Sequence, residues 1–397
     1  MSQHDLLIEI GCEEIPAKDQ PVLGQLLTER LDAALDAQGV AHGPLRWFAA
    51  PRRLAVLVAG VAAQQAQQEV YRRGPALAAA FNAEGQATPA ALGFAKSCGV
   101  EITALQRESG DKGEFLAYRA SSPGRATQII LPDLISTVIH ALPLRKRMRW
   151  AAGEAEFVRP VKWLLALFGD TPLPISLFEQ QAGSHSYGHR IHHPQAIFIQ
   201  NPTDYPQALM QAQVLADFDS RRQRIVQETF TLAQREGGAA WLPDSLLDEI
   251  TGLCEWPVAL AGGFDAACLD IPPEVLSTVM IQHQRYVPVL KQAGGKALLN
   301  RFIFIANLES QDPAAVIHGN ERVLRARFSD AGFFWQEDRK VPLEARLDGL
   351  AQVTFQQGLG SLADKTRRLQ DLAPELAELA GASAAHCAAV QAGRAAR

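Results

Sequence analysis

The sequence predicts a multi-domain α+β protein. We expect mixed sheets with packed helices in the N-terminal and middle regions and an all-helical C-terminal segment. The 397 residues exceed the ~100–200 of a usual single domain. Short apolar runs alternate with helical periodicities as far as residue 312, and the spacing after that is helical. We place three domains at 1–143, 144–334 and 335–397.

The N-terminal domain begins with an apolar strand at 6–10. A helix follows, which we expect to stop before Gly39. We interpret residues 47–58 as a strand with an edge or bulge at Pro51. The helix is predicted by leucines at helical spacing, namely Leu23, Leu26, Leu27, Leu31 and Leu35.

The rest of this domain contains one predicted loop and three predicted elements. Residues 71–75 carry a Gly-Pro loop signal. Thr88 and Pro89 predict a helix start, with the helix continuing to about residue 98. Residues 115–118 predict a strand, and a helix over 133–142 must end before the proline that follows it.

The middle domain is predicted to mix strands and helices. A polar, histidine-rich loop runs from 184 to 194, and Gly294-Gly295 predicts a hairpin turn. The predicted strands are 161–168, 175–178, 197–199, 258–261, 286–290 and 302–306, and the predicted helices are 206–218, 220–236, 245–254 and 273–282. The C-terminal domain ends in an Ala-rich helical stretch without a cap signal, from which we expect a truncated chain.

Composition limits the classes of function. Apolar residues make up 47% and charged residues 20%, as in a globular protein with a sizeable core. A protein that binds nucleic acid through one dominant basic face usually has a basic balance, whereas here the net charge is -5 and the pI is 6.1, so any RNA contact must come from local patches. Five cysteines without a C-x-x-C pair indicate reduced thiols. With no signal peptide and no run of ~18 apolar residues, we expect a cytoplasmic protein without a membrane partner.

Familiar catalytic and cofactor motifs are absent from the sequence. It lacks a phosphate loop, a nucleophile elbow, an H-E-x-x-H zinc motif and the H-I-G-H and K-M-S-K-S pair of one synthetase class. Residues 319–322 (G-N-E-R) only faintly resemble another class's motif, and we interpret them as a turn beside a helix. We therefore assign no catalytic, cofactor-binding or metal-binding residue.

Two polar clusters have both a functional and a structural interpretation. His185, His189, His192 and His193 could hold a metal or a phosphate, but no Cys or carboxylate stands at ligand spacing, which favours a solvated loop. The second cluster surrounds Gly11 at a strand end and consists of Glu9, Glu13 and Glu14. No nucleophile lies near it in sequence, so we expect these carboxylates to face solvent or an arginine such as Arg52.

The densest basic run is the best candidate for RNA contact. Its cations could follow a phosphate backbone while the adjacent indole stacks on a base. The candidates are Arg145, Lys146, Arg147, Arg149 and Trp150, with Arg52 and Arg53 in second place. The alternative is a solvated face, or arginines paired with Glu154 and Glu156. Arg72-Arg73, and Arg322, Arg325 and Arg327, are weaker candidates still.

Twelve ordered segments together resemble one family, the beta subunit of bacterial heterotetrameric glycyl-tRNA synthetase. The segments are collinear and cover almost the whole chain. They are L-L-I-E-I-G-C-E-E-I-P (6–16), W-F-A-A-P-R-R-L-A-V (47–56), R-R-G-P-A (72–76), D-K-G-E-F-L (111–116), M-R-W (148–150), F-V-R-P-V (157–161), S-Y-G-H-R (186–190), E-W-P-V (255–258), F-I-F-I-A-N-L-E-S (302–310), G-N-E-R-V-L-R-A-R (319–327), F-Q-Q-G-L-G-S-L (355–362) and D-K-T-R-R (364–368). Cys12, where a hydroxyl residue is expected, and the strongly basic 145–149 depart from the family pattern.

The resemblance implies a tRNA-binding, non-catalytic subunit of an α2β2 heterotetramer. Its alpha subunit would use ATP with magnesium to attach glycine to tRNA(Gly). The resemblance also implies two N-terminal parts, one similar to the editing module of phenylalanyl-tRNA synthetase and one to the body and tail of CCA-adding enzymes. Residues 335–397 would begin an HD-like domain. Two alternatives stay open: a scaffold for the alpha subunit with little RNA contact, and a metal-dependent hydrolase or editing module.

Overall fold

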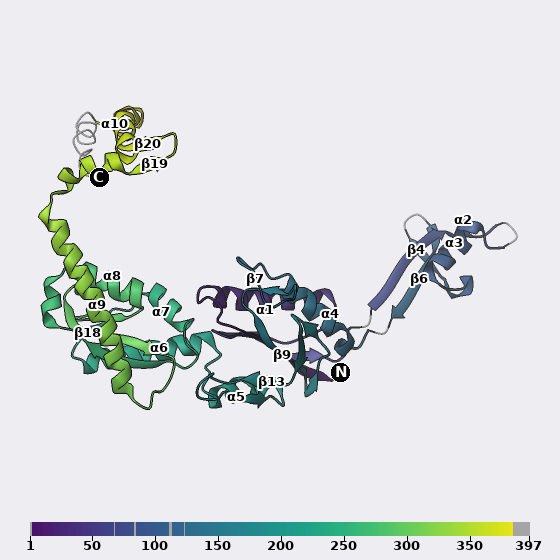
Figure 1. The fold of residues 1–397 in the computed structure, drawn as a ribbon. Helices are drawn as coiled ribbons and strands as arrows, with labels where there is room; N and C mark the ends of the chain where they lie inside the picture. The colour runs from purple at the N-terminus through teal and green to yellow at the C-terminus, as the bar shows by residue number, and fades with distance from the viewer. Residues whose placement is uncertain (1, 67, 83–84, 111–112, 123, 384–397) are drawn as a thin grey trace. The chain divides into compact units, whose positions relative to one another are not determined.

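The computed structural model describes residues 2–66, 68–82, 85–110, 113–122 and 124–383 (Figure 1). The chain forms two compact units. The first comprises Met1–Leu232, Leu242–Leu260 and Ile305–Gln311, and the second comprises Ala233–Trp241, Ala261–Phe304 and Asp312–Arg397. The domains placed at 1–143, 144–334 and 335–397 remain a prediction. Strand β9 (Val161–Phe168) pairs with β1 (Gln3–Cys12), and helix α9 (Pro313–Lys340) runs through residue 335.

A mixed sheet is the centre of the first unit. Its strand order is β11-β12-β9-β1-β3-β2, with β10 paired to β9. β12 lies parallel to β9, and the other neighbours are antiparallel. The remaining strands are β2 (Leu45–Ala50), β3 (Arg53–Ala62), β10 (Thr171–Pro172), β11 (Ser176–Leu177) and β12 (Gln180–Gly183).

The Pro51-Arg52 step is a hairpin turn, and the predicted single bulged strand over 47–58 is wrong. Leu45 pairs with Val58 and Ala50 with Arg53, so β2 and β3 lie antiparallel. Proline suits a tight turn because its ring fixes φ and it has no amide hydrogen to donate to a sheet. Because the chain reverses here, Arg53 is the first residue of β3, opposite Gly11 of β1.

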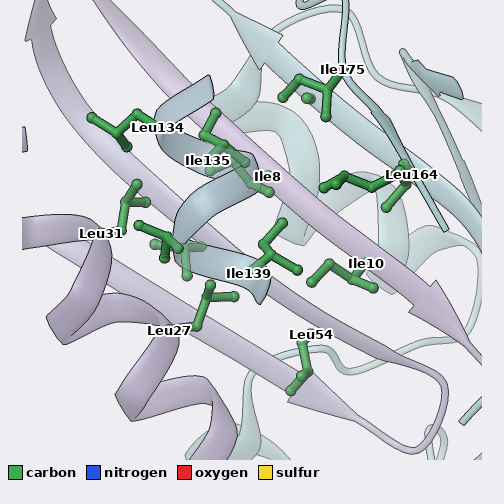
Figure 2. Close-up of a cluster of buried hydrophobic side chains, with 14 of the residues drawn as sticks. Ile8, Ile10, Leu27, Leu31, Leu54, Leu134, Ile135, Ile139, Leu164 and Ile175 are labelled. Atoms are coloured by element: carbon green, nitrogen blue, oxygen red, sulfur yellow. The ribbon is translucent and has the colours of Figure 1, made fainter. Parts of the chain in front are cut away.

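Helices α1 (Asp19–Ala37) and α4 (Thr127–His140) pack on one face of this sheet (Figure 2). The predicted leucine periodicity is confirmed, since Leu27 and Leu31 of α1 are buried there. Ile8 and Ile10 point to this face from β1, as strand alternation requires. At ~25 cal/mol per Å² of buried apolar area, this layer is a main source of the unit's stability.

The opposite face of the sheet carries a second apolar layer. Leu7, Leu165 and Phe48 pack there against Tyr205 and Leu209 of α5. The same unit contains β7 (Met148–Arg149), β8 (Glu156–Phe157), β13 (His185–Tyr187), β14 (Ala196–Phe198), η2 (Pro202–Asp204), α5 (Tyr205–Gln211), α7 (Asp244–Thr251) and most of α6 (Phe218–Arg235). Glu9 alternates to this second face, and its burial there sets up the site described below.

Residues 68–122 form a small module with a sheet and apolar cluster of its own. The strand order is β4-β6-β5, and two helices contribute to the cluster. Its elements are β4 (Gln68–Ala76), α2 (Leu77–Ala80), α3 (Pro89–Cys98), η1 (Ile102–Ala104), β5 (Gln106–Gly110) and β6 (Gly113–Ser122). The predicted helix at 89–98 is confirmed. The predicted loop at 71–75 is wrong because cross-strand pairing with β6 extends β4 through those residues.

The second unit is built on a four-stranded sheet of order β15-β17-β18-β16. The Gly294-Gly295 turn joins β17 to β18, as predicted. Residues 319–322 lie inside α9 and not in a turn, because Leu324 and Phe328 of that helix pack into the core. The elements are β15 (Ala239–Ala240), β16 (Val258–Gly263), η3 (Ala266–Asp270), α8 (Pro273–Thr278), the π-helix η4 (Val279–Gln284), β17 (Val287–Leu290) and β18 (Leu298–Ala306).

As far as residue 383, where the described part of the chain ends, the C-terminal segment is helical apart from one hairpin. Helix α9 is followed by η5 (Leu343–Gln352) and α10 (Leu362–Leu379). Between them β19 (Thr354–Gln356) and β20 (Gly360–Ser361) form a hairpin, so the all-helical prediction is wrong at this point. Gly358 and Gly360 both have φ near +83°, which favours the hairpin turn. Within the described residues, no helix has the length and apolarity to cross a bilayer.

Candidate functional site: a buried ionic cluster and an exposed basic run

A fully buried arginine is the centre of the most polar site in the first unit. Arg53 Nη1 lies 3.1 Å from Glu9 Oε1 and 3.2 Å from Ser186 Oγ. Its Nη2 lies 3.1 Å from Glu255 Oε1. Arg53 and both glutamates are at most 2% exposed. We call Arg53, Glu9, Glu255 and Ser186 the ionic cluster. It joins four segments that lie far apart in the sequence.

The strand geometry explains how the chain accommodates this cluster. Gly11 faces the indole of Trp163, and a Cβ on this glycine would lie 1.8 Å from Trp163 Cε2. Only glycine at this position of β1 therefore leaves room for the Trp163 indole of β9. The Arg53 guanidinium carbon lies 5.6 Å from the centre of the Trp163 ring, which allows a cation–π contact.

The charges of the ionic cluster depend on one another. Burial raises the pKa of Glu9, although Arg53 and the hydrogen bond from Ser186 oppose this shift. The two carboxylates raise the pKa of Arg53 despite its own desolvation, so the guanidinium stays charged. A buried arginine with two acidic neighbours needs only one of them ionised for neutrality, which agrees with a raised pKa at Glu9.

The glutamates of the predicted Glu9, Glu13 and Glu14 cluster have separate environments. Glu9 faces an arginine, as one form of the expectation had it, but this arginine is the buried Arg53 and not Arg52, because alternation along β1 directs Glu9 inward. Glu13 and Glu14 pair with Arg190, at 2.8 Å and 3.1 Å. Lys162 adds a 3.6 Å contact to Glu13. These outer pairs are partly exposed and contribute little to stability.

The histidine-rich segment begins as strand β13, so the loop predicted over 184–194 is wrong at 185–187, and its histidines make structural contacts. His189 is buried, and its Nδ1 accepts hydrogen bonds from the amides of Ile191 and His192 at 3.3 Å. Burial lowers the pKa of His189, which suits this acceptor role. His192 Nε2 accepts from the Glu309 amide at 3.0 Å, and His185 packs edge-on against Phe198. In the described parts of the chain, no group of three or more His, Cys, Asp or Glu could hold a metal ion.

The predicted basic run lies on the surface over most of its length. Arg145, Lys146 and Arg147 are exposed, and within the described residues no carboxylate pairs with them. Arg149 pairs with Glu156 at 3.2 Å across the β7–β8 ladder. This ion pair is the one that the sequence analysis gave as the alternative to RNA contact. Trp150 packs against the core and lies 6.3 Å from the Phe178 ring. The structure therefore leaves three unpaired cations in this run.

The two second-place RNA candidates are not on an open surface. Arg53 is fully buried in the ionic cluster, which leaves no part of it for a phosphate in this conformation. Arg52 is half-buried and lies 5.5 Å from the Trp163 ring. The weaker candidates Arg322, Arg325 and Arg327 are exposed on α9.

Two neighbouring residues of α9 make hydrogen bonds within the second unit. Asn320 accepts a hydrogen bond from Tyr286 at 2.6 Å, and Glu321 accepts one from the Gly263 amide at 2.8 Å.

Sequence reasoning missed a second buried arginine, Arg221 of α6. It donates to the carbonyls of Thr251 at 2.9 Å, Leu215 at 2.5 Å and Ala49 at 2.8 Å. No carboxylate pairs with it within the described structure, and burial lowers its pKa to about 10. Arg221 thus links α6 to α7 and β2. Nothing in the periodicity of α6 distinguishes it from the neighbouring Arg222.

The members of the ionic cluster lie in segments that carry the resemblance. Glu9 belongs to L-L-I-E-I-G, Arg53 to P-R-R-L, and Ser186 to S-Y-G-H-R. Glu255 belongs to E-W-P-V, and its amide donates to Asn307 Oδ1 at 2.6 Å. The ordered set of short segments was therefore a signal for this site, although no single segment predicted it. The fold and these contacts define a protein of mixed helices and sheets whose first unit contains a buried ionic cluster.

Comparison with known proteins identifies the family. A family model described as glycyl-tRNA synthetase beta subunit matches residues 6–397, and the chain belongs to this family. It is 48% identical over 372 residues to a glycine--tRNA ligase beta subunit from Acidithiobacillus ferrooxidans, covering 94% of this chain and 53% of the relative. Proteins of the same description from Pseudomonas putida and Klebsiella pneumoniae are 44% identical over 384 and 387 residues, covering 97% of this chain and 55% and 56% of those relatives. The chain spans about half the length of these curated relatives.

Proposed function

We propose that this chain is the tRNA-handling, non-catalytic part of a two-subunit glycyl-tRNA synthetase. In this proposal it works with an alpha subunit in an α2β2 heterotetramer, and the alpha subunit uses ATP with magnesium to attach glycine to tRNA(Gly). The observation that carries the proposal is the family match over 6–397. The lack of phosphate-loop and synthetase motifs in the sequence supports an indirect role in the chemistry.

The division of labour can be tested by ATP–pyrophosphate exchange. We expect no glycine-dependent exchange from this chain alone, because its sequence has no nucleotide-binding motif. Alpha subunit alone and alpha subunit with this chain are the two comparison reactions, and tRNA charging is measured in parallel. Exchange catalysed by this chain by itself would contradict the proposal.

The exposed basic run supports direct contact with tRNA. Arg145, Lys146 and Arg147 offer three cations that no described carboxylate pairs with, and such a local patch is a source of electrostatic attraction on a chain with an acidic net charge. We propose that these side chains bind backbone phosphates. Arg149 could join them only by leaving Glu156, so its contribution should be smaller. Trp150 would need to leave its contacts with the core before it could stack on a base.

Filter binding tests this contact. Changing Arg145 and Arg147 to glutamine should weaken tRNA binding and flatten its salt dependence, because each phosphate contact releases counterions and contributes ~0.7–0.9 to the slope of log K against log [salt]. Arg149→Gln should have a smaller effect. Arg222→Gln, which removes an exposed ion-paired arginine from α6, is the matched control. Unchanged binding and slope in the Arg145/Arg147 variant would favour the scaffold alternative, in which this part of the chain holds the alpha subunit.

A further inference from the structure

The small module formed by residues 68–122 has one sheet face covered by helices and one that the described helices leave open. Leu116 and Tyr118 of β6 belong to the helix-covered face, where they pack with the cluster around α2 and α3. Arg72 lies on the same side and donates to the Ser97 carbonyl of α3 at 2.9 Å. Since side chains alternate along a strand, the intervening residues of β4 and β6 belong to the other face.

That open face combines aromatic rings with arginines. Tyr71 and Arg73 of β4 stand opposite Arg119 and Ala117 of β6. Arg73 lies over the Phe115 ring at 4.0 Å, and Arg119 lies over the Tyr71 ring at 4.8 Å. Tyr71 keeps 48% of its surface exposed, which is unusual for a large aromatic residue on a sheet. We call Tyr71, Arg73, Phe115 and Arg119 the aromatic–arginine face.

One arginine of this face is available to an anionic group such as a phosphate. Glu108 is already bound, to Arg119 at 2.6 Å and to the Tyr71 hydroxyl at 3.1 Å. Arg73 is exposed and has no carboxylate within ion-pair distance among the described residues. Its free donors therefore face solvent over an aromatic ring.

We propose that the aromatic–arginine face binds a single-stranded segment of RNA. An exposed aromatic ring beside arginines on a sheet suits unpaired bases, because such a ring stacks on bases of any sequence while the cations bind phosphates. Tyr71 supplies the stacking surface and Arg73 the phosphate contact. Arg119 over one side of the ring and Glu108 at the hydroxyl fix the orientation of Tyr71. This inference rests on the proposed tRNA-handling function and places a second contact away from the basic run.

The test uses the full chain and a fluorescent, unstructured RNA of about 12 nucleotides, within the size range that single-strand sites occupy. Tyr71→Leu should weaken binding by about 5- to 150-fold, the range measured for loss of one stacked base. Arg73→Gln should lower the salt slope by about 0.7, as expected for one phosphate of a single strand. Arg72→Gln is the matched control, because it removes the neighbouring arginine from the helix-covered face.

Two further measurements keep the result specific. A 4-thiouridine in the RNA should crosslink to the β4 peptide that contains Tyr71, as read by mass spectrometry, and the crosslink should disappear in Tyr71→Leu. Unchanged thermal unfolding of each variant shows that the module is intact. The inference is overturned if Tyr71→Leu and Arg73→Gln bind the RNA with the same affinity as wild type. It is also overturned if the wild-type chain does not bind the RNA. The proposed function is tested separately, by filter binding of the Arg145/Arg147 variant and by the ATP–pyrophosphate exchange assay.

Discussion

Replacing Arg53 with methionine should lower the free energy of unfolding of the first unit by about 3–5 kcal/mol, the range for breaking a buried ion pair by removing one partner. The substitution keeps an unbranched apolar stem but removes the guanidinium between Glu9 and Glu255, whose carboxylates lie 3.1 Å from its two terminal nitrogens. Two desolvated carboxyls would then remain without a cation. Urea unfolding followed by tryptophan fluorescence measures the loss, because Trp163 touches the cluster.

Three comparisons test this explanation. Arg46→Met removes an exposed arginine from β2, where it pairs with Asp217, and should cost no more than about 1 kcal/mol. Adding Glu9→Gln and Glu255→Gln to the Arg53 variant should recover part of the loss, because no buried charge is then left alone. A triple variant as unstable as the single one would mean that packing, and not charge, dominates at this position.

The same variant should respond to pH in a defined direction. Burial already raises the pKa of Glu9, and the removal of Arg53 removes the charge that opposes this shift. A carboxyl with a raised folded-state pKa contributes most below its unfolded-state pKa, and this contribution is lost as the pH rises through the folded value. The stability deficit of Arg53→Met relative to wild type should therefore be smaller in acid than at neutral pH.

Local sequence signals predicted those parts of the fold that depend on periodicity and on turn chemistry. The leucine spacing of α1 and the apolar runs of β1 and β9 predicted the type of each element, although β1 extends over Gln3–Cys12, beyond the predicted 6–10. The errors fell where pairing between strands decided the outcome. Pro51 was assigned to a bulge because sequence alone does not show that β2 and β3 pair with each other. Residues 71–75 looked like a loop for the same reason.

The candidate site was predictable only in part. Exposure of Arg145, Lys146 and Arg147 agrees with a surface role, but their contact with RNA remains a prediction. Burial of Arg53 was hidden because its three partners lie 44, 133 and 202 residues away. Charge patterns in a sequence describe neighbours along the chain, whereas an ionic cluster of this kind depends on neighbours in space. The adjacent Arg52 and Arg53 differ in environment because a strand begins between them.

Replacing Arg221 with methionine should also destabilise the first unit by more than about 3 kcal/mol. Its guanidinium donates to three carbonyls at 2.5–2.9 Å, and each buried carbonyl left without a donor costs about 1–3 kcal/mol. With a pKa of about 10, the group remains charged at neutral pH. Its burial is tolerated because the carbonyl dipoles of Leu215, Ala49 and Thr251 converge on it and replace the hydration that it loses.

The adjacent residue of α6 supplies the matched control. Arg222 binds Asp244 at 2.7 Å and Asp248 at 2.9 Å, but this network lies on the surface, so Arg222→Met should cost at most about 1 kcal/mol. Two neighbouring arginines with the same substitution then differ only in what surrounds them. Hydrogen exchange gives the second readout: amides of α7 and β2 should lose protection in the Arg221 variant, since its contacts link those elements to α6. Equal losses of stability for both variants would contradict the view that convergent carbonyls hold these three elements together.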